Sequence, residues 1–381
     1  MTRKKILLPF LAAIIALSAN AQTDSTKTFV LSGSVDAYTR YDFNNVTSTT
    51  AGVPTNAKTS FTQSNNSFEL GMASLTGTGQ ILSGKVFGTA DLGFGPRAES
   101  FNALNGDATP GGLLAVKQLY VGIYTGKGTN GIKFSLGKWY THIGYEVPDA
   151  VNNRNYSMDY MFTEGPFSHT GIKAEYTKKT WHFMLGVANP TNVVTIPDGT
   201  AAGSGTKHLL AQIDDVTKNG KWHFYLNFEG AEGMNASGSG LVKATNQFDF
   251  VATGTISSKF SVGLNLTDKM FSYNSDAGGT TAKADAWGGG ALYLNWDPTA
   301  LFGLTLRSEY FIDNDGLTGL GTQNILDETL SANFRVGPLT IIPELRYESA
   351  DTKFGDIYVK GNDATPTGTD FSGILAAVYK F

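Results

Sequence analysis

The feature that most constrains the fold is a strict alternation between long and short connections along a series of strand-like segments. Sixteen segments alternate apolar and polar side chains with a period of two. They span residues 29–43, 67–77, 81–94, 113–125, 131–143, 168–177, 181–188, 207–217, 221–230, 245–256, 258–267, 283–296, 301–312, 328–336, 339–349 and 371–381. The long connections are residues 44–66, 95–112, 144–167, 189–206, 231–244, 268–282, 313–327 and 350–370, and the short ones are residues 77–80, 126–130, 178–180, 218–220, 257–258, 297–300 and 337–338. This asymmetry is typical of outer-membrane barrels and predicts about sixteen antiparallel strands with both termini on the short-turn side.

The two faces of these segments differ in polarity. Trp181, Phe183 and Leu185 share a face opposite His182 and Met184, and later segments repeat the pattern. Because no backbone group can stay unpaired in lipid, such strands cross a membrane only as a closed barrel. A soluble β-sandwich also alternates, but it gives no reason for alternating loop lengths. We therefore predict an all-β fold, a transmembrane antiparallel up-and-down β-barrel with short periplasmic turns and long extracellular loops.

The last segment fits the closing strand of such a barrel. Phe371, Leu375, Ala377, Tyr379 and Phe381 fall on one face of it, and the sequence stops on the aromatic residue. This ending resembles the assembly signal of bacterial outer-membrane barrels. We expect the segment to pair with the first strand.

The first residues indicate export. A basic start at residues 2–5 precedes an apolar run at residues 6–17 and a small-x-small site that ends at Ala21. The apolar run is too short for a membrane anchor. We predict a cleaved signal peptide at residues 1–21, a single barrel domain at residues 22–381 and a location in the outer membrane, in contact with its lipid and lipopolysaccharide.

Charge and composition exclude several classes of partner. Cleavage after Ala21 leaves 26 basic residues against 33 acidic ones, a net charge of −7, which argues against nucleic acid as a partner. The chain has no cysteine, so neither disulfides nor thiolate metal sites are expected. No cofactor motif appears, and no zinc-ligand spacing.

The polar faces indicate a water-filled lumen. At about sixteen strands a barrel is too wide for its own side chains to fill. The charged residues expected to line it are Arg40, Lys85, Lys133, Lys173, Glu175, Glu229, Arg307, Glu309, Arg335, Glu344 and Arg346. This mixed lining suits small polar solutes but predicts no preference between anions and cations, because the narrowest ring sets selectivity.

Residues 137–171 carry the most specific motifs. They comprise a Gly-Lys-Trp-Tyr-Thr-His-Ile-Gly-Tyr-Glu run at 137–146, an Asn-Asn-Arg-Asn-Tyr-Ser run at 152–157 and a Gly-Pro-Phe-Ser-His-Thr-Gly run at 165–171. The combination resembles the second family of β-barrel porins, the OmpL-like family, which is common in Bacteroidetes. The resemblance implies an outer-membrane channel, and the analogy with general porins suggests a homotrimer. Met158 and Asp159 replace a more basic pair of the family, so no charge preference carries over.

The same residues suggest a pore constriction. They join the fifth and sixth strands, where general porins fold a loop inward. We hypothesise that Glu146, Asp149, Arg154, Asp159 and Glu164 form a constriction in which acids face one base. The alternative is that Arg154 pairs with Asp149 or Asp159 and rigidifies an external loop.

Two other functions are possible for such a barrel. A plugged barrel would act as an adhesin or receptor through its extracellular loops. A barrel hydrolase would need a Ser/His/acid cluster, but His169, His182 and His223 lie on separate strands with no evident orienting acid. We therefore expect no enzymatic activity.

Three places in the strand pattern are irregular. The face of the apolar residues changes within 67–77, and both faces look apolar within 113–125. Either a β-bulge in one of these segments or a strand count that is wrong by two is expected. Gly137, next to Lys138 on the lipid-facing register, indicates a bulge or the membrane edge.

Overall fold

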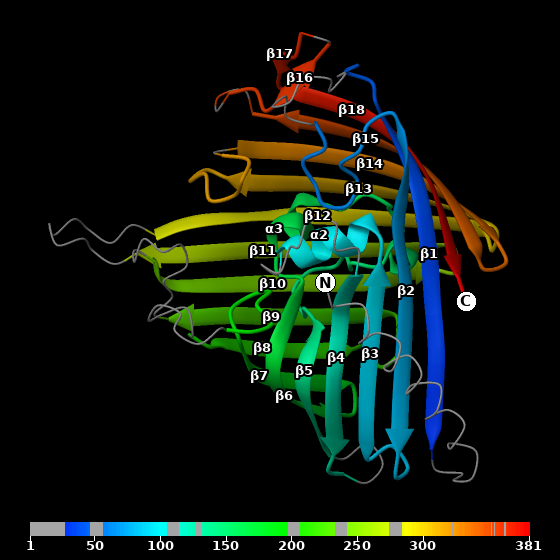
Figure 1. Cartoon of the computed structure of the whole chain (residues 1–381), viewed down its shortest axis with the longest axis vertical. Helices are drawn as coiled ribbons and strands as arrows, with labels where there is room; N and C mark the ends of the chain where they lie inside the picture. Colours follow the sequence, from blue (N-terminus) through cyan, green and yellow to red (C-terminus); the bar gives the residue numbers. More distant parts are fainter. Residues whose placement is uncertain are drawn as a thin grey trace, which may run out of the picture.

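The computed structural model describes residues 27–45, 56–104, 114–126, 131–196, 206–232, 242–273, 284–321, 323–351, 353, 355–361 and 363–381. Sixteen strands form one closed antiparallel barrel, as predicted. Figure 1 shows them in chain order around the ring, with β1 beside β18. The predicted signal peptide and most of the predicted turn at 126–130 lie outside the described residues.

The barrel strands are β1 (Thr28–Asp42), β2 (Ser67–Ile81), β3 (Val86–Phe94), β4 (Leu114–Tyr124), β5 (Ile132–Tyr140), β6 (Ser168–Lys178), β7 (Trp181–Ala188), β8 (His208–Val216), β9 (Trp222–Glu232), β10 (Val242–Ser257), β11 (Phe260–Tyr273), β12 (Ala284–Thr299), β13 (Phe302–Asp313), β14 (Gln323–Val336), β15 (Leu339–Ala350) and β18 (Thr369–Lys380). The loops contain α2 (Pro96–Leu104), η2 (Ala150–Asn152), α3 (Tyr160–Glu164) and a hairpin of β16 (Tyr358–Lys360) and β17 (Thr365–Thr367). None of the helices in the described part of the chain is long and apolar enough to cross a membrane.

The first and last strands close the barrel. β1 pairs with β18 from Ser34 opposite Lys380 to Asp42 opposite Ser372. The backbones of Gly33 and Phe381 also exchange two hydrogen bonds of 2.9 Å. The C-terminal strand therefore has the role expected from its sequence, and it ends at the short-turn side.

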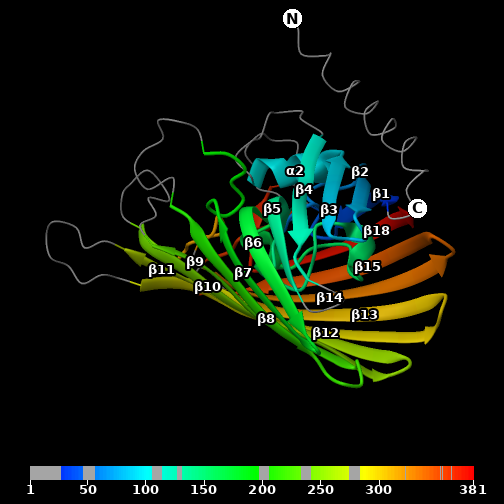
Figure 2. The same ribbon diagram turned by 90° about the horizontal axis from the view of Figure 1, so that it is seen from below.

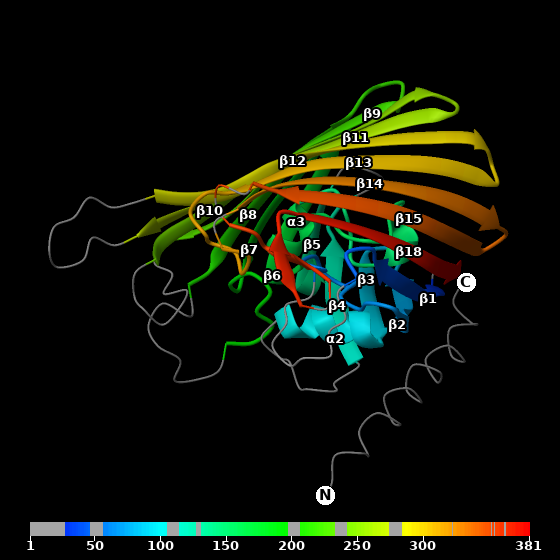
Figure 3. The same cartoon turned by 90° about the horizontal axis from the view of Figure 1, so that it is seen from above.

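Apolar side chains lie on the outer face of the strands and polar ones on the inner face, as predicted. Leu136 and Leu185 point outward and are 60% and 63% exposed on the isolated barrel, whereas Arg307 and Glu309 point inward and are fully buried. Figure 2 and Figure 3 show the strands tilted around a common interior, and Figure 3 shows α3 inside the ring of strands.

Both irregular strands contain a bulge. In β2, Val35 pairs with Ala73 and Ala37 with Leu70, so β2 carries one extra residue. In β4, Asp91 pairs with Gln118 and Leu92 with Val116, so Lys117 is the extra residue. This bulge turns the fully buried Lys117 into the lumen next to Gln118, which explains why the sequence pattern of β4 looked apolar on both faces.

The prediction of a bulge at Gly137 is wrong. The pairing of β5 with β4 and with β6 runs through this residue without a shift. Gly137 has a φ of +137°, and a Cβ there would collide with the carbonyl of Leu119. The glycine is required for this backbone conformation and close approach.

The predicted turn at 77–80 is also wrong. β2 continues to Ile81, and the turn lies at 82–85, with Leu82, Ser83 and Gly84 all at positive φ. Gly77 lies within the strand, under the ring of Phe29. A large aromatic side chain covers this glycine, so it does not mark a turn. Lys85 consequently lies exposed in the turn and does not line the lumen.

Candidate pore and its inward loop

The loop between β5 and β6, residues 141–167, crosses the interior of the barrel. At one side His142 Nε2 lies 3.0 Å from the carbonyl oxygen of Phe228 in β9. At the other side the Tyr156 hydroxyl donates to Asp36 in β1 at 2.6 Å. β1 and β9 are eight positions apart in the sixteen-strand ring, so these contacts lie on opposite walls.

Wall side chains accept hydrogen bonds from the loop backbone along this path. The amide of Gly144 donates to Asp249 at 3.0 Å, and that of Tyr160 donates to Glu309 at 2.8 Å. Glu344 accepts from the amide of Tyr156 at 2.7 Å. Several backbone amides of the loop therefore donate their hydrogen bonds to carboxylates of the wall instead of to a helix or strand partner.

The fully buried guanidinium of Arg307 fixes the middle of the loop. It donates to Glu146 at 2.7 Å, to the carbonyl oxygen of Ser157 at 2.8 Å and to Asp327 at 2.9 Å. Arg346 acts in the same way and donates to the carbonyl oxygen of Met158 at 2.7 Å. Arginine suits this position because its planar fork donates to several acceptors at once.

A buried ammonium holds the start of the loop. Lys117, presented by the bulge of β4, lies 2.6 Å from Asp149 and 3.0 Å from Asp91. Asp149 also accepts from the Tyr140 hydroxyl at 2.6 Å and from Ser74 at 2.5 Å. These side-chain contacts of Asp149 tie the loop to β2, β4 and β5.

The tip of the loop reaches the short-turn end. Arg154 donates from Nη1 to Asp297 Oδ2 at 3.0 Å and from Nη2 to Oδ1 at 2.9 Å. Asp297 also accepts from Arg335 at 2.8 Å. The alternative in which Arg154 pairs with Asp149 or Asp159 is therefore not what the structure shows.

The five residues of the hypothesised constriction do not form one ring of acids around a base. Glu146 and Asp159 lie together, because Glu146 accepts from the Asp159 amide at 2.8 Å and the Tyr293 hydroxyl bonds both carboxylates. Asp159 also caps α3 through the amide of Phe162. Asp149 and Arg154 each have a partner on the wall.

The pKa values of the acids in the loop are shifted in different directions. Burial raises the pKa of Glu146 to about 7, and Asp159 adds to this effect. Burial and then the charge of Asp313 raise the pKa of Glu164 to about 7. Burial alone would raise the pKa of Asp149 as well, but Lys117 holds it below its usual value.

The predicted lining residues fall into two groups. Arg40, Glu229, Arg307, Glu309, Glu344 and Arg346 are buried in ion pairs or under the loop. Lys133, Lys173, Glu175 and Arg335 keep side-chain exposures of 42%, 16%, 16% and 28%. The sequence prediction missed Lys117, which the bulge hides, and Asp327, which lay just before the predicted start of its strand.

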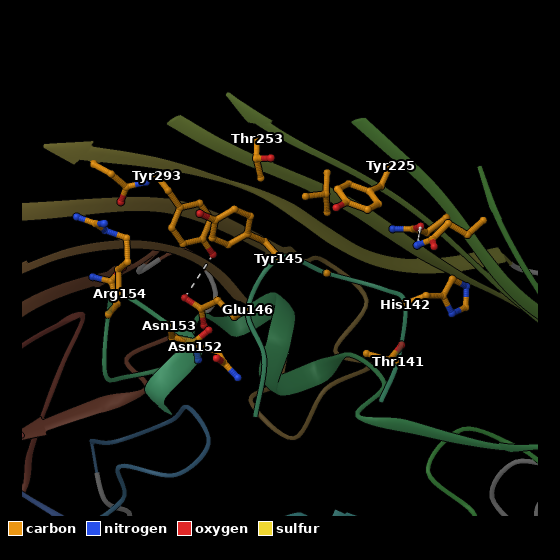
Figure 4. A pocket seen from close by; sticks show the side chains of 16 residues that line it. Thr141, His142, Tyr145, Glu146, Asn152, Asn153, Arg154, Tyr225, Thr253 and Tyr293 are labelled. Atoms are coloured by element: carbon orange, nitrogen blue, oxygen red, sulfur yellow. Dashed lines mark hydrogen bonds between the residues drawn. The ribbon is translucent and has the colours of Figure 1, made fainter. Parts of the chain in front are cut away.

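Space remains between the loop and one wall. A cavity of about 410 Å³ lies there (Figure 4). Its lining residues are Thr141, His142, Gly144, Tyr145, Glu146, Asn152, Asn153, Arg154, Asn155, Gln212, Tyr225, Asn227, Val251, Thr253, Tyr293 and Asn295. A second cavity of about 280 Å³ lies between Ala150–Arg154 and the turn at Gly337 and Pro338. Together the two cavities follow the loop toward the short-turn end.

The histidine rings have hydrogen-bond partners that their positions in the sequence did not reveal. Asp214 lies 2.6 Å from His182 Nδ1 and 2.8 Å from His223 Nε2, so the expectation that no acid orients the histidines is wrong for these two. The Tyr225 hydroxyl lies 2.6 Å from the other nitrogen of His223. In the described part of the chain no serine or threonine hydroxyl is bonded to His182 or His223, whereas the Thr141 hydroxyl lies 3.0 Å from His169 Nε2. Within those same residues, no group of three His, Cys, Asp or Glu side chains could hold a metal ion.

Comparisons with solved structures give the same fold. The outer membrane channel DcaP of Acinetobacter baumannii aligns with a TM-score of 0.61 at 12% identity, over 94% of this chain and 99% of that one. OmpF of Salmonella typhi, in complex with daunomycin, aligns at 0.58 and 11%, over 93% and 98%. OmpT of Vibrio cholerae in its trimer form aligns at 0.57 and 9%, over 94% and 100%. At these identities the likeness establishes the fold alone.

The sequence itself establishes the family. No curated protein matches the chain. The family described as "Putative beta-barrel porin-2, OmpL-like" matches residues 28–381, from the first residue of β1 to the last residue of the chain. The match includes the inward loop and all sixteen barrel strands, and the chain belongs to this family of OmpL-like β-barrel porins.

Proposed function

We propose that the protein is an outer-membrane porin that lets small hydrophilic solutes diffuse passively, and that residues 141–167 narrow its pore. The observation that carries this proposal is the loop that reaches from β1 to β9 and leaves a polar cavity of about 410 Å³ beside it. A barrel of this size without the loop would have a wide aqueous lumen.

The attachment of the loop supports a fixed constriction. Arg307, Arg346 and Lys117 hold it through buried ion pairs and bonds to its carbonyl oxygens. Breaking a buried ion pair from one side leaves an uncompensated charge, which costs about 3–5 kcal/mol. A segment attached in this way keeps its position while solutes pass.

Single-channel recording of the refolded mature chain in a planar bilayer tests the proposal. We expect steady ohmic steps, and the reversal potential under a salt gradient gives the ion preference. A folded, heat-modifiable barrel without steps would contradict a channel and indicate a plugged barrel that binds partners through its loops.

We also propose a homotrimer, by analogy with the trimer form of OmpT from Vibrio cholerae. Conductance steps that appear in threes, together with the mass of the detergent-solubilised complex, test the oligomeric state. Single steps and a monomer mass would contradict it.

A further inference from the structure

We propose that the cavity beside the loop selects neutral polyhydroxylated solutes, such as sugars and polyols, over ions of the same size. This inference rests on the proposed function, because it names the solute class of the same pore. The polarity of the lining, the position of its charges and the arrangement of its tyrosines carry it.

Amide and hydroxyl side chains make up most of the lining. The wall contributes Gln212, Asn227, Thr253 and Asn295 from four strands, and the loop contributes Asn152 and Asn153. An amide side chain both donates and accepts hydrogen bonds, as a sugar hydroxyl does. Such a lining surrounds a polyol with neutral hydrogen-bonding groups, although Asn153 and Asn227 are also bonded to Val147, Gln212 and Asp249.

Each charge at the cavity has a bonded partner. Among the described residues that line it, Glu146 and Arg154 are the acid and the arginine; Glu146 is bonded to Arg307, and Arg154 shares the carboxylate of Asp297 with Arg335. The Glu146 side chain is only 2% exposed. Burial lowers the pKa of His142, so its imidazole stays neutral near pH 7.

Asp249, a wall carboxylate bonded to two lining residues, is screened by amides. Asp249 accepts hydrogen bonds from Asn227 at 2.7 Å, from Asn265 at 2.5 Å and from the amide of Gly144 at 3.0 Å. It is 1% exposed. A charged solute would therefore lose part of its hydration in the cavity without gaining a free counter-charge, which is unfavourable.

Three tyrosine rings line the cavity. Tyr145 of the loop stacks on Tyr293 of β12 with ring centroids 4.0 Å apart, and Tyr225 of β9 lies farther along the wall (Figure 4). A tyrosine offers an apolar ring and a polar hydroxyl. Solutes with both C–H faces and hydroxyl groups match this surface, and the volume of 410 Å³ falls within the range of about 300–1,000 Å³ typical of small-molecule sites.

The test compares three sugars of equal ring size in proteoliposomes that contain the mature protein. The probes are neutral glucose, anionic glucuronate and cationic glucosamine, and their uptake is measured from radiolabel at equal concentration. We expect glucose to enter about threefold or more faster than either ion, because the lining offers no free charge.

Two substitutions of Gln212 place a negative or a positive charge in the lining, with side chains close in length to that of glutamine. Gln212→Glu should raise glucosamine over glucuronate uptake by about threefold or more, and Gln212→Lys should reverse the order. Asn219→Asp, in the exposed turn between β8 and β9, is the matched control and should leave all three rates unchanged.

The outcomes separate this inference from the proposed function. Ohmic steps in potassium chloride together with equal uptake of all three sugars would overturn the solute class but keep the porin. Unchanged ratios in both Gln212 variants would show that the cavity is not the path and would overturn the inference as well. Absence of any conductance would overturn the porin itself.

Discussion

Arg154 at the tip of the inward loop is bonded to both carboxylate oxygens of Asp297 on β12, at 2.9 and 3.0 Å. Arg335 on β14 donates to the same carboxylate at 2.8 Å. The first of these pairs ties the loop to the wall, whereas the second joins two wall strands. The two arginines have equal side-chain exposures of 28%, so their substitutions can be compared directly.

We predict that Arg154→Met makes the open-channel current noisier and raises its mean, because the tip of the loop is released. Arg335→Met should change the current little, although Asp297 loses one partner in both variants. Single-channel recording at one salt concentration measures the difference. Equal noise in both variants would contradict a tether at the tip.

Replacing Lys117, which anchors the loop, is predicted to destabilise the protein strongly. Lys117→Met leaves Asp91 and Asp149 buried without their cation and should lower the free energy of unfolding by about 3–5 kcal/mol. Urea unfolding in micelles measures this loss, with the exposed Lys221→Met as control. The double variant Lys117→Met/Asp149→Asn should recover part of the stability, and a double variant as unstable as the single one would contradict the pairing.

Glu164 should make the stability of α3 depend on pH. Burial and Asp313 raise its pKa to about 7 in the folded loop, so the protonated form is favoured there. The loop is then most stable below the unfolded pKa of about 4.3 and loses stability as pH rises through 7.

Hydrogen exchange of the α3 amides between pH 5 and pH 8 tests this sign. After correction for intrinsic rates, opening should increase at high pH, about tenfold for each pKa unit of difference. Glu164→Gln should reduce the dependence, with a remainder from Glu146, whose pKa is also raised to about 7, while the exposed Glu232→Gln should leave it unchanged. A dependence that Glu164→Gln does not reduce would assign it to another group.

Adjacent residues of β8 should differ in access from the lumen. Gln212 lines the cavity, whereas Ile213 is 43% exposed on the outer face. The chain has no cysteine, so Gln212→Cys and Ile213→Cys each give one thiol. A charged thiol reagent should reduce the current of Gln212→Cys by about a third or more and leave Ile213→Cys unchanged. Equal block of both variants would contradict the assignment of the faces.

The barrel could be predicted from the sequence because the pattern that specifies it is contained in short segments. Alternation over about ten residues and the lengths of the connections suffice to place strands when lipid forbids unpaired edges. The strand count, the closure of β1 on β18 and the outer face of residues such as Leu185 are therefore confirmed. The misplacement of the turn at 77–80 came from glycines that Phe29, distant in sequence, covers. The turn predicted at 297–300 also began too early, since β12 continues to Thr299.

The interior could be predicted only in part. The sequence suggested that the loop runs inward, but it could not identify the partners of the loop, because they are far away in the chain. Asp297 lies 143 residues after Arg154, and Glu344 lies 188 residues after Tyr156. Lys117 was hidden because a bulge changes the face of every residue after it. Arg307 and Arg346 were expected to contact water, but they hold the loop.

The conductance of a variant that lacks residues 150–160, compared with that of the full mature chain, tests most directly whether the loop narrows the pore. The deletion removes Arg154, Tyr156 and Tyr160, the first residue of α3, which carry contacts to β12, β1 and β13. For a variant that remains heat-modifiable, the account predicts a conductance about twofold or more above that of the full chain, since the interior of a sixteen-strand barrel is wide. An unchanged conductance in a folded variant would contradict it.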